Sequence, residues 1–214
     1  MEIAIPLYDR FTALDAIGPY EVLGRLPGAQ VRFIAHEAGP VTTDTRMLTL
    51  VAEARLEDVA APDVLLVPGG GGARALLEDE RMLAWIRGAH ETSTWTTSVC
   101  TGSLLLAAAG VLDGLEATTH WAARDQLESL GARPAARRVV RQDKVVTAAG
   151  VSAGIDMALT LAGLIAGEDL ARAIQLGIEY DPQPPFGAGS PEGAGPDLVA
   201  LVRQGIDAAE RERA

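Results

Sequence analysis

The residue best suited to chemistry is Cys100, the one cysteine of the chain. The run 94–110 around it predicts a strand, a tight turn at the cysteine and an apolar helix. Ser98 and Gly102 flank it in the pattern Ser-x-Cys-x-Gly, the thiol form of a strand–nucleophile–helix turn. The N-terminus of the following helix favours a thiolate at this position. Cys100 is therefore a candidate nucleophile, and the alternative is a buried structural cysteine.

A second candidate element is the glycine run 69–72, which directly follows the apolar strand predicted at 63–67. Glycines let backbone N–H groups approach an anion closely. The run lacks the Gly-Lys-Ser/Thr ending of a phosphate-binding loop. An oxyanion site that Gly70 forms with the N–H of Thr101 fits the pattern better, and a flexible turn is the alternative.

Asp15 lies at the predicted corner between the first strand and the first helix. By itself such a residue is most simply a helix cap. A carboxyl close to a thiol would titrate with it as a coupled pair, because one of the two groups must hold the proton. Asp15 is therefore a candidate proton carrier for a cysteine reaction.

A cysteine–histidine triad would need an imidazole within reach of the sulfur. The chain has three histidines. His36 has no obvious partner at the end of an early strand, and His90 is expected to be solvated on a charged helix end. His120 could approach Cys100 or could position the neighbouring turn, and catalysis without histidine has to be considered.

These candidates need a fold that brings strand ends together. Strands alternate with helices along the chain, which predicts an α/β fold with a mainly parallel sheet covered by helices on both faces. Ligands of such sheets bind outside the carboxyl ends of the strands. The predicted strands are 2–8, 31–36, 63–67, the strand before Cys100, and a hairpin of 137–141 with 144–147, and a short β-ribbon is predicted at 41–51. The predicted helices are 14–26 with a start near Gly18, 80–91, 122–130, 155–165, 168–180 and 198–210, with a loop at 181–196.

Composition limits the class of protein. The 214 residues are 48% hydrophobic, and no domain boundary is visible, so we expect a single domain over 1–214. A net charge of −11 disfavours binding to nucleic acid. One cysteine excludes an internal disulfide and a cysteine-based zinc cluster. The sequence has no visible signal peptide and no apolar run long enough for a membrane span, so we expect a cytoplasmic protein that does not bind membranes.

Several of these segments together resemble the ThiJ/PfpI superfamily. Within it the chain is similar to the isocyanide hydratases, and Thr101 stands where protease-like and glyoxalase-like members usually have histidine. The superfamily segments are 67–70 (Val-Pro-Gly-Gly), 98–102 (Ser-Val-Cys-Thr-Gly), 118–121 (Thr-Thr-His-Trp) and 149–156 (Ala-Gly-Val-Ser-Ala-Gly-Ile-Asp), and the hydratase-like segments are 12–21 around Asp15 and 180–186 (Tyr-Asp-Pro-Gln-Pro-Pro-Phe).

The resemblance implies a flavodoxin-like three-layer sandwich, a homodimer and a reaction that needs no metal or organic cofactor. It implies that Cys100 attacks the terminal carbon of an organic isocyanide to give a thioimidate. Asp15 would manage the protons, and water would release an N-substituted formamide. Thr101 and Gly70 would position the reacting group, with Gly150 and Val151 as a pocket wall near the sulfur.

Two alternatives to this small-molecule enzyme stay open. The same domain forms the sensor half of AraC-type transcription regulators, although only about one helix follows residue 196 here, too little for a DNA reader. The second alternative is a redox-responsive or non-catalytic binding domain, in which Cys100 is oxidised rather than used in turnover.

Overall fold

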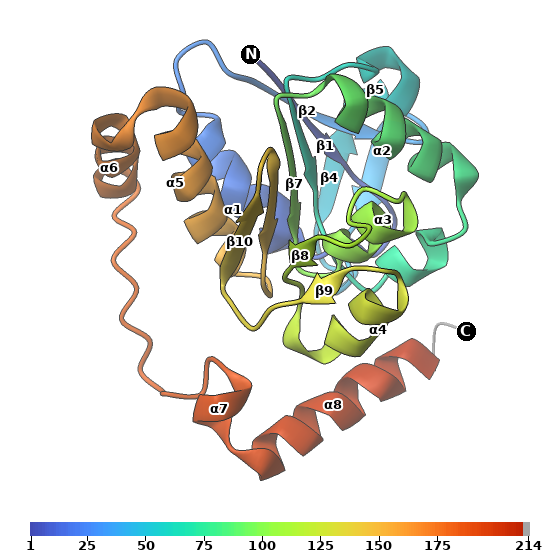
Figure 1. Ribbon diagram of the computed structural model, residues 1–214, viewed down its shortest axis with the longest axis vertical. Coiled ribbons are helices and arrows are strands. Elements are labelled where there is room, and N and C mark those ends of the chain that lie inside the picture. The colour runs from blue at the N-terminus through green and yellow to red at the C-terminus, as the bar shows by residue number, and fades with distance from the viewer. Residues whose placement is uncertain (212–214) are drawn as a thin grey trace. The chain divides into compact units, whose positions relative to one another are not determined.

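The computed structural model describes residues 1–211, and its centre is a seven-stranded sheet (Figure 1). The strand order is β10-β11-β7-β6-β1-β2-β5. All neighbours are parallel except β10, which runs antiparallel to β11, so the predicted mainly parallel sheet is confirmed. The strands are β1 (Glu2–Pro6), β2 (Gln30–Ala35), β5 (Ala54–Arg55), β6 (Val64–Val67), β7 (Trp95–Val99), β10 (Val139–Gln142) and β11 (Val145–Ala148).

The order of the five main parallel strands identifies the topology. Across the sheet these five strands lie in the order β2-β1-β6-β7-β11. When they are numbered from one to five along the chain, this order is 2-1-3-4-5. This is the flavodoxin-like order, in which ligands bind at the carboxyl ends of the strands. The predicted flavodoxin-like fold class is confirmed, and the strand ends after β1, β6, β7 and β11 become the place to look for a site.

Helices cover both faces of the sheet and make it a three-layer sandwich. Helices α1 and α5 pack together on one face, and α2 and α3 lie on the other (Figure 1). The α-helices are α1 (Ala13–Leu23), α2 (Glu80–Thr92), α3 (Gly102–Ala108), α4 (Arg124–Ser129), α5 (Ala153–Ala166), α6 (Glu168–Gly177), α7 (Pro191–Ala194) and α8 (Pro196–Arg211), and the 3-10 helices are η1 (Leu56–Val59), η2 (Ala73–Leu76) and η3 (Trp121–Ala123).

Two small sheets lie beside the main one. Strands β3 (Gly39–Thr42) and β4 (Thr49–Ala52) pair antiparallel, which confirms the β-ribbon predicted at 41–51. Strands β8 (Glu116–Ala117) and β9 (Arg133–Pro134) pair parallel. The loop between β3 and β4 bonds to the segment that leads into α1, so it takes part in building the site.

The first helix begins earlier than the sequence indicated. We expected a start near Gly18, because proline suits a first helical turn, but α1 begins at Ala13 and contains Pro19. Asp15, Gly18 and Pro19 are all buried in this helix. Tertiary packing therefore outweighs the helix bond that proline cannot make. The shift places Asp15 inside the first turn rather than before the helix.

Two later boundaries also differ from expectation. Helix α6 ends at Gly177, although the apolar spacing predicted a helix to residue 180. The proline- and glycine-rich segment 181–196, predicted as a loop, contains the one-turn helix α7, which Ser190 caps by accepting a bond from the N–H of Gly193. Helix α7 comes from local capping by Ser190, which hydrophobic spacing does not report.

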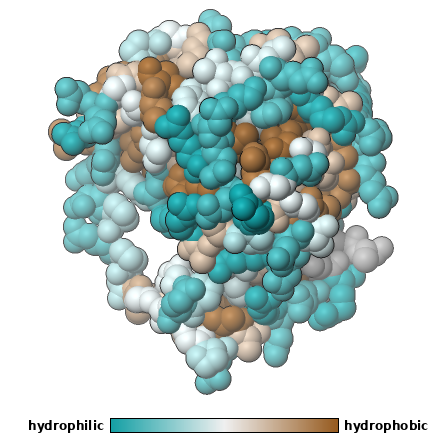
Figure 2. All heavy atoms as spheres, in the orientation of Figure 1, coloured by the Kyte–Doolittle hydropathy of each residue, from teal (hydrophilic) through white to brown (hydrophobic). Residues whose placement is uncertain are grey.

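The core explains why the central strands read as continuous apolar runs. All four residues of β6 are buried, as are the last four of β1, because helices cover both faces of the sheet. Figure 2 shows that hydrophilic residues cover most of the face in view, with hydrophobic residues in patches between them. In the part of the chain that the structure describes, no helix is long and apolar enough to cross a membrane.

The chain divides into two compact units. The first, Met1–Ile178, contains every strand and the helices from α1 to α6. The second begins at Glu179 and contains α7 and α8. The sheet and all candidate site residues lie in the first unit, and one ThiJ/PfpI-like domain over the whole chain stays a prediction.

Candidate active site

Cys100 stands in a strained turn between β7 and α3. Its φ of +55° lies in the left-handed region that residues with a Cβ seldom adopt. The Cys100 N–H donates to the carbonyls of Ala148 (3.1 Å) and Ala149 (2.9 Å). Its carbonyl accepts from the hydroxyls of Ser103 and Thr119, both at 3.0 Å. These bonds hold a conformation that the residue alone would not keep, and Cys100 is only 5% exposed.

Some groups around the sulfur of Cys100 oppose a thiolate, and others favour it. Burial raises the pKa of the Cys100 thiol, and the charge of Asp15 raises it further. The N–H groups of Val151 and Thr101, with the Thr101 hydroxyl, lower the pKa by hydrogen bonding to the sulfur. Protonation of the neighbouring carboxyl therefore eases formation of a thiolate, although burial still opposes it.

Asp15 is that carboxyl, and it is fully buried. Its Oδ2 accepts from the N–H of Gly69 at 2.9 Å, whereas its Oδ1 has no hydrogen-bond partner in standard geometry within residues 1–211. Burial raises the pKa of Asp15 to about 7, although the Gly69 N–H and the Cys100 thiol act to lower it. Thr12, not Asp15, is the N-cap residue of α1. Asp15 and Cys100 thus form a buried pair whose protonation states depend on each other, and the carboxyl is the member that titrates near neutral pH.

The glycine turn after β6 brings the pair together. A Cβ on Gly69 would lie 2.5 Å from the Thr101 nitrogen and 2.9 Å from Oδ2 of Asp15, so only glycine fits. The N–H of Gly70 donates to Oγ1 of Thr101 at 2.9 Å, and this hydroxyl also lies 3.2 Å from the Gly70 carbonyl. The Gly70 N–H is therefore bonded to Thr101, and the N–H groups directed at the sulfur are those of Thr101 and Val151.

The corner after β11 forms another side of the site. Val151 has a φ of +32°, and its N–H reaches the sulfur. Gly150 lies against the ring of His120, where a Cβ would be 2.8 Å from Cδ2. His120 caps η3, because its Nδ1 accepts from the N–H of Ala122 at 3.3 Å. Burial, then the charge of Arg74, lowers the pKa of His120, which favours the neutral imidazole.

Sequence reasoning missed three polar side chains of the site. Tyr8 is buried at the end of β1 and donates to the carbonyl of Pro68 at 2.8 Å. Burial raises the pKa of Tyr8, and the charges of Asp15 and Cys100 add to the effect. Ser103 and Thr119 hold the Cys100 carbonyl. The position of Tyr8 at the end of a predicted strand was a signal that could have found it. The sequence gives no signal for Ser103 and Thr119, because their contacts with Cys100 depend on the fold.

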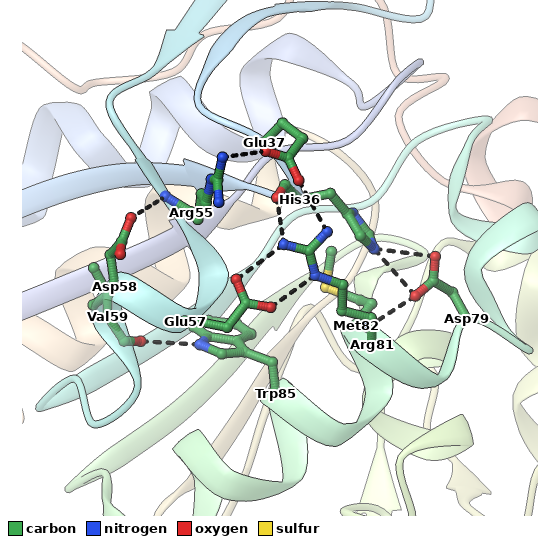
Figure 3. A network of polar contacts seen from close by, with 10 residues as sticks. All are labelled: His36, Glu37, Arg55, Glu57, Asp58, Val59, Asp79, Arg81, Met82 and Trp85. Atoms are coloured by element: carbon green, nitrogen blue, oxygen red, sulfur yellow. Dashed lines mark hydrogen bonds and ion pairs between the residues drawn. The ribbon is translucent and has the colours of Figure 1, made fainter.

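His36 belongs to a separate polar network on the surface at the end of β2 (Figure 3). Its Nε2 lies 3.1 Å from the carboxylate of Asp79, so the expectation that it has no partner was wrong. Asp79 also caps α2 by accepting from the Met82 N–H at 2.9 Å. Arg81 bonds to Glu57 at 2.7 Å and to the carbonyl of His36 at 2.6 Å. The partners are far apart in sequence, which is why local inspection did not find them.

The third histidine also differs from expectation. Nδ1 of His90 lies 2.8 Å from Oγ1 of Thr96, so this residue is half-buried and bonded to β7 rather than solvated. Burial lowers the pKa of His90. Across residues 1–211, no group of three His, Cys, Asp or Glu side chains could hold a metal ion.

Comparison with known proteins assigns the family: residues 1–163 match the DJ-1/PfpI family, and the chain belongs to it. The chain is 46% identical over 204 residues to a protein from Pseudomonas putida named isonitrile hydratase. The aligned residues cover 95% of this chain and 89% of that relative. These matches confirm the ThiJ/PfpI resemblance.

Solved structures agree with this assignment. A ThiJ/PfpI family protein from Pseudomonas syringae superposes with a TM-score of 0.90 at 38% identity, over 98% of this chain and 89% of the other. DJ-1beta from Drosophila melanogaster shares the fold, with a TM-score of 0.77 at 22% identity over 85% of this chain and 98% of the other.

A transcriptional regulator from Pseudomonas aeruginosa, CdhR, is also similar in sequence. It is 29% identical over 73% of this chain, and the matched residues span 47% of that regulator.

Proposed function

We propose that this protein hydrates organic isocyanides, also called isonitriles, to N-substituted formamides. The observation that carries the proposal is the buried Cys100–Asp15 pair, in which a carboxyl with a pKa of about 7 adjoins a thiol that meets two backbone N–H groups. An isocyanide carbon needs both a nucleophile and a proton, and this pair can supply both. The likeness to the Pseudomonas putida isonitrile hydratase supports the assignment.

The first half of the reaction forms the covalent intermediate. With one proton on Asp15 and a thiolate at Cys100, the sulfur attacks the terminal carbon and a C–S bond forms. The electron pair that stays on that carbon takes the proton from Asp15, which gives the thioimidate Cys–S–CH=N–R. Thr101 and Val151 support the thiolate through their N–H groups before the attack.

The second half uses water and restores the pair. Asp15, now a carboxylate, takes a proton from water while the oxygen adds to the thioimidate carbon, and it then passes that proton to nitrogen. The tetrahedral intermediate expels the sulfur as the C=O bond forms, and its hydroxyl proton returns to Asp15. The N-substituted formamide leaves, and Cys100 is again a thiolate beside a protonated Asp15.

The wider proposal is a cytoplasmic homodimer that acts on a small molecule and binds neither nucleic acid nor membranes. The net charge of −11 supports the lack of nucleic-acid binding. Exposed apolar side chains on α6 and α8 would suit a second copy of the chain. They are Leu176, Leu198, Leu201 and Val202.

The test is formamide production from a small alkyl or aryl isocyanide by purified protein, with Cys100→Ala beside it. We expect turnover in the wild type and none in the variant. Absence of turnover across several isocyanides would contradict the hydratase function. A redox-responsive or non-catalytic binding domain would then be the favoured function. The likeness to part of the regulator CdhR supports this second candidate. A redox sensor would form a reversible sulfenic acid or a stable sulfinic acid at Cys100, without turnover.

A further inference from the structure

The loop between β3 and β4 presents an acidic side chain to the start of α1. The N–H of Asp44 donates to the carbonyl of Phe11 at 2.9 Å, and the N–H of Arg10 donates to the carbonyl of Thr42 at 2.9 Å. Oδ2 of Asp44 accepts from the hydroxyl of Thr12 at 2.6 Å, a short bond of the charge-assisted kind. The Asp44 carboxylate is thereby fixed rather than free to turn toward solvent.

Thr12 links this carboxylate to the buried pair. It is the N-cap residue of α1, yet its hydroxyl bonds to Asp44 instead of capping the helix. Its N–H donates to the carbonyl of Gly69 at 2.8 Å, and the N–H of Gly69 holds Oδ2 of Asp15 at 2.9 Å. A continuous set of hydrogen bonds thus fixes Asp44 relative to Asp15.

Three ionisable groups on the elements packed around Asp15 interact with it: Cys100 and Asp44 shift its pKa, and its charge raises the pKa of Tyr8. Tyr8 comes from the end of β1, Cys100 from the turn after β7, and Asp44 from the β3–β4 loop. The charge of Asp44 raises the pKa of Asp15, after the larger effect of burial. The leading groups that shift the pKa of the Cys100 thiol, besides burial, are Asp15 and the N–H and hydroxyl donors described above. Asp44 is bonded to the start of α1, the helix that carries Asp15, so its charge lies on the carboxyl side of the pair.

We propose that Asp44 is a positioning residue that biases the shared proton of the pair toward Asp15 and so leaves the negative charge on the sulfur of Cys100. A fixed anion on the carboxyl side destabilises the carboxylate of Asp15, so it shifts the balance of a single proton toward the neutral carboxyl and the thiolate. The consequence for turnover rests on the proposed function. The effect on the thiolate does not need an isocyanide to be observed.

The sole cysteine of the chain makes the test direct, because alkylation by iodoacetamide reports on Cys100 alone. Asp44→Asn removes the charge and keeps an acceptor for Thr12. We expect its alkylation rate to fall about 3- to 10-fold at pH 8, where the pair holds one proton, as for loss of one nearby charge. At pH 5.5, where Asp15 is protonated in both proteins, the rates should agree.

The sign of the change distinguishes the two ways in which Asp44 could act. If its charge acted on the sulfur directly, Asp44→Asn would speed alkylation at pH 8, and that result would overturn the proposal. The double variant Asp15→Asn with Asp44→Asn should alkylate no more slowly than Asp15→Asn alone, and an equal slowing there would also overturn it. Thr12→Val, which frees the Asp44 carboxylate, should slow the reaction in the same direction.

A matched control separates this effect from general charge loss. Asp9 lies on the same segment and pairs with Arg46 of the loop at 2.7 Å. Asp9→Asn should alkylate at the wild-type rate, and a decrease equal to that of Asp44→Asn would contradict the specific link. Alkylation is measured without substrate, so it tests this inference even if the protein turns over no isocyanide. A lack of turnover would contradict the proposed function and would leave the alkylation result unaffected.

Discussion

The N–H of Gly69 donates to Oδ2 of Asp15 at 2.9 Å, so the turn after β6 holds a carboxyl carried by the helix after β1. The bond orients one oxygen and leaves Oδ1 without a donor in standard geometry among the described residues. One N–H does not replace the hydration that a carboxylate has in water. The fold therefore favours the protonated form of Asp15 at a stability cost that depends on pH.

This cost predicts that Asp15→Asn stabilises the protein at pH 8. A carboxyl with a folded-state pKa of about 7 binds more protons in the folded than in the unfolded state between about pH 4 and pH 7. Wild-type stability therefore falls as pH rises through this window. The variant should gain up to about 4 kcal/mol in unfolding free energy at pH 8 and little at pH 4.5, measured by urea denaturation.

The same variant should be a poor enzyme. Asparagine can still accept from Gly69 but cannot carry the proton, so we expect formamide production to fall roughly 10²-fold or more. Turnover at the wild-type rate would remove Asp15 from the mechanism. Gain of stability together with loss of turnover would show that the buried carboxyl serves function rather than folding.

Much of this arrangement could be predicted from local sequence. Cys100 stands out as the one cysteine at a strand–helix turn, and the alternation of elements predicts a parallel sheet. The rule that ligands lie at strand ends then groups Asp15, Gly70 and Thr101. The structure brings these residues together with Val151, although their catalytic roles stay predictions.

Contacts between distant segments could not be predicted in this way. The bond from Thr119 to the Cys100 carbonyl and the contact of Asp44 with Thr12 join segments whose spacing carries no pattern. The early start of α1 had a related cause, because burial of Pro19 overrides a local preference. Hydrophobic period and turn signals report on elements, whereas these contacts depend on how the elements pack.

Gly69→Ala should disrupt the site. The added Cβ would lie 2.5 Å from the Thr101 nitrogen, so the turn must move away from both Thr101 and Asp15. We expect a loss of about 1–3 kcal/mol in stability and a large loss of turnover. The control is Gly88→Ala in α2, where a Cβ meets nothing within 4 Å and helix propensity predicts a gain of about 0.5–1 kcal/mol. Equal effects in the two variants would contradict the steric argument.

Thr119→Val tests the support of the nucleophile turn. The substitution keeps the shape of the side chain and removes the 3.0 Å bond to the Cys100 carbonyl, which is buried. The Cys100 carbonyl keeps its bond from Ser103, so loss of the Thr119 donor should cost about 0.5–1.5 kcal/mol in unfolding free energy. Thr160→Val removes an exposed hydroxyl bond of 2.8 Å to Asp156 and should cost at most about 0.5 kcal/mol. Similar losses in both would show that the Thr119 bond gives the turn no special support.

Asp79→Ala tests the surface network apart from the active site. Asp79 caps α2 through the Met82 N–H and pairs with His36. Partial burial acts to raise its pKa, but these two partners prevail and lower it. A lowered pKa contributes stability above the unfolded value near 4 that is lost as pH falls, so we expect a cost of about 1–2 kcal/mol at pH 7 that shrinks below pH 4. Asp79→Asn keeps a good cap and should cost less, while formamide production should not change in either variant. If alanine and asparagine cost the same in urea denaturation, the cap contributes nothing and the contact of the Asp79 carboxylate with His36 carries the effect.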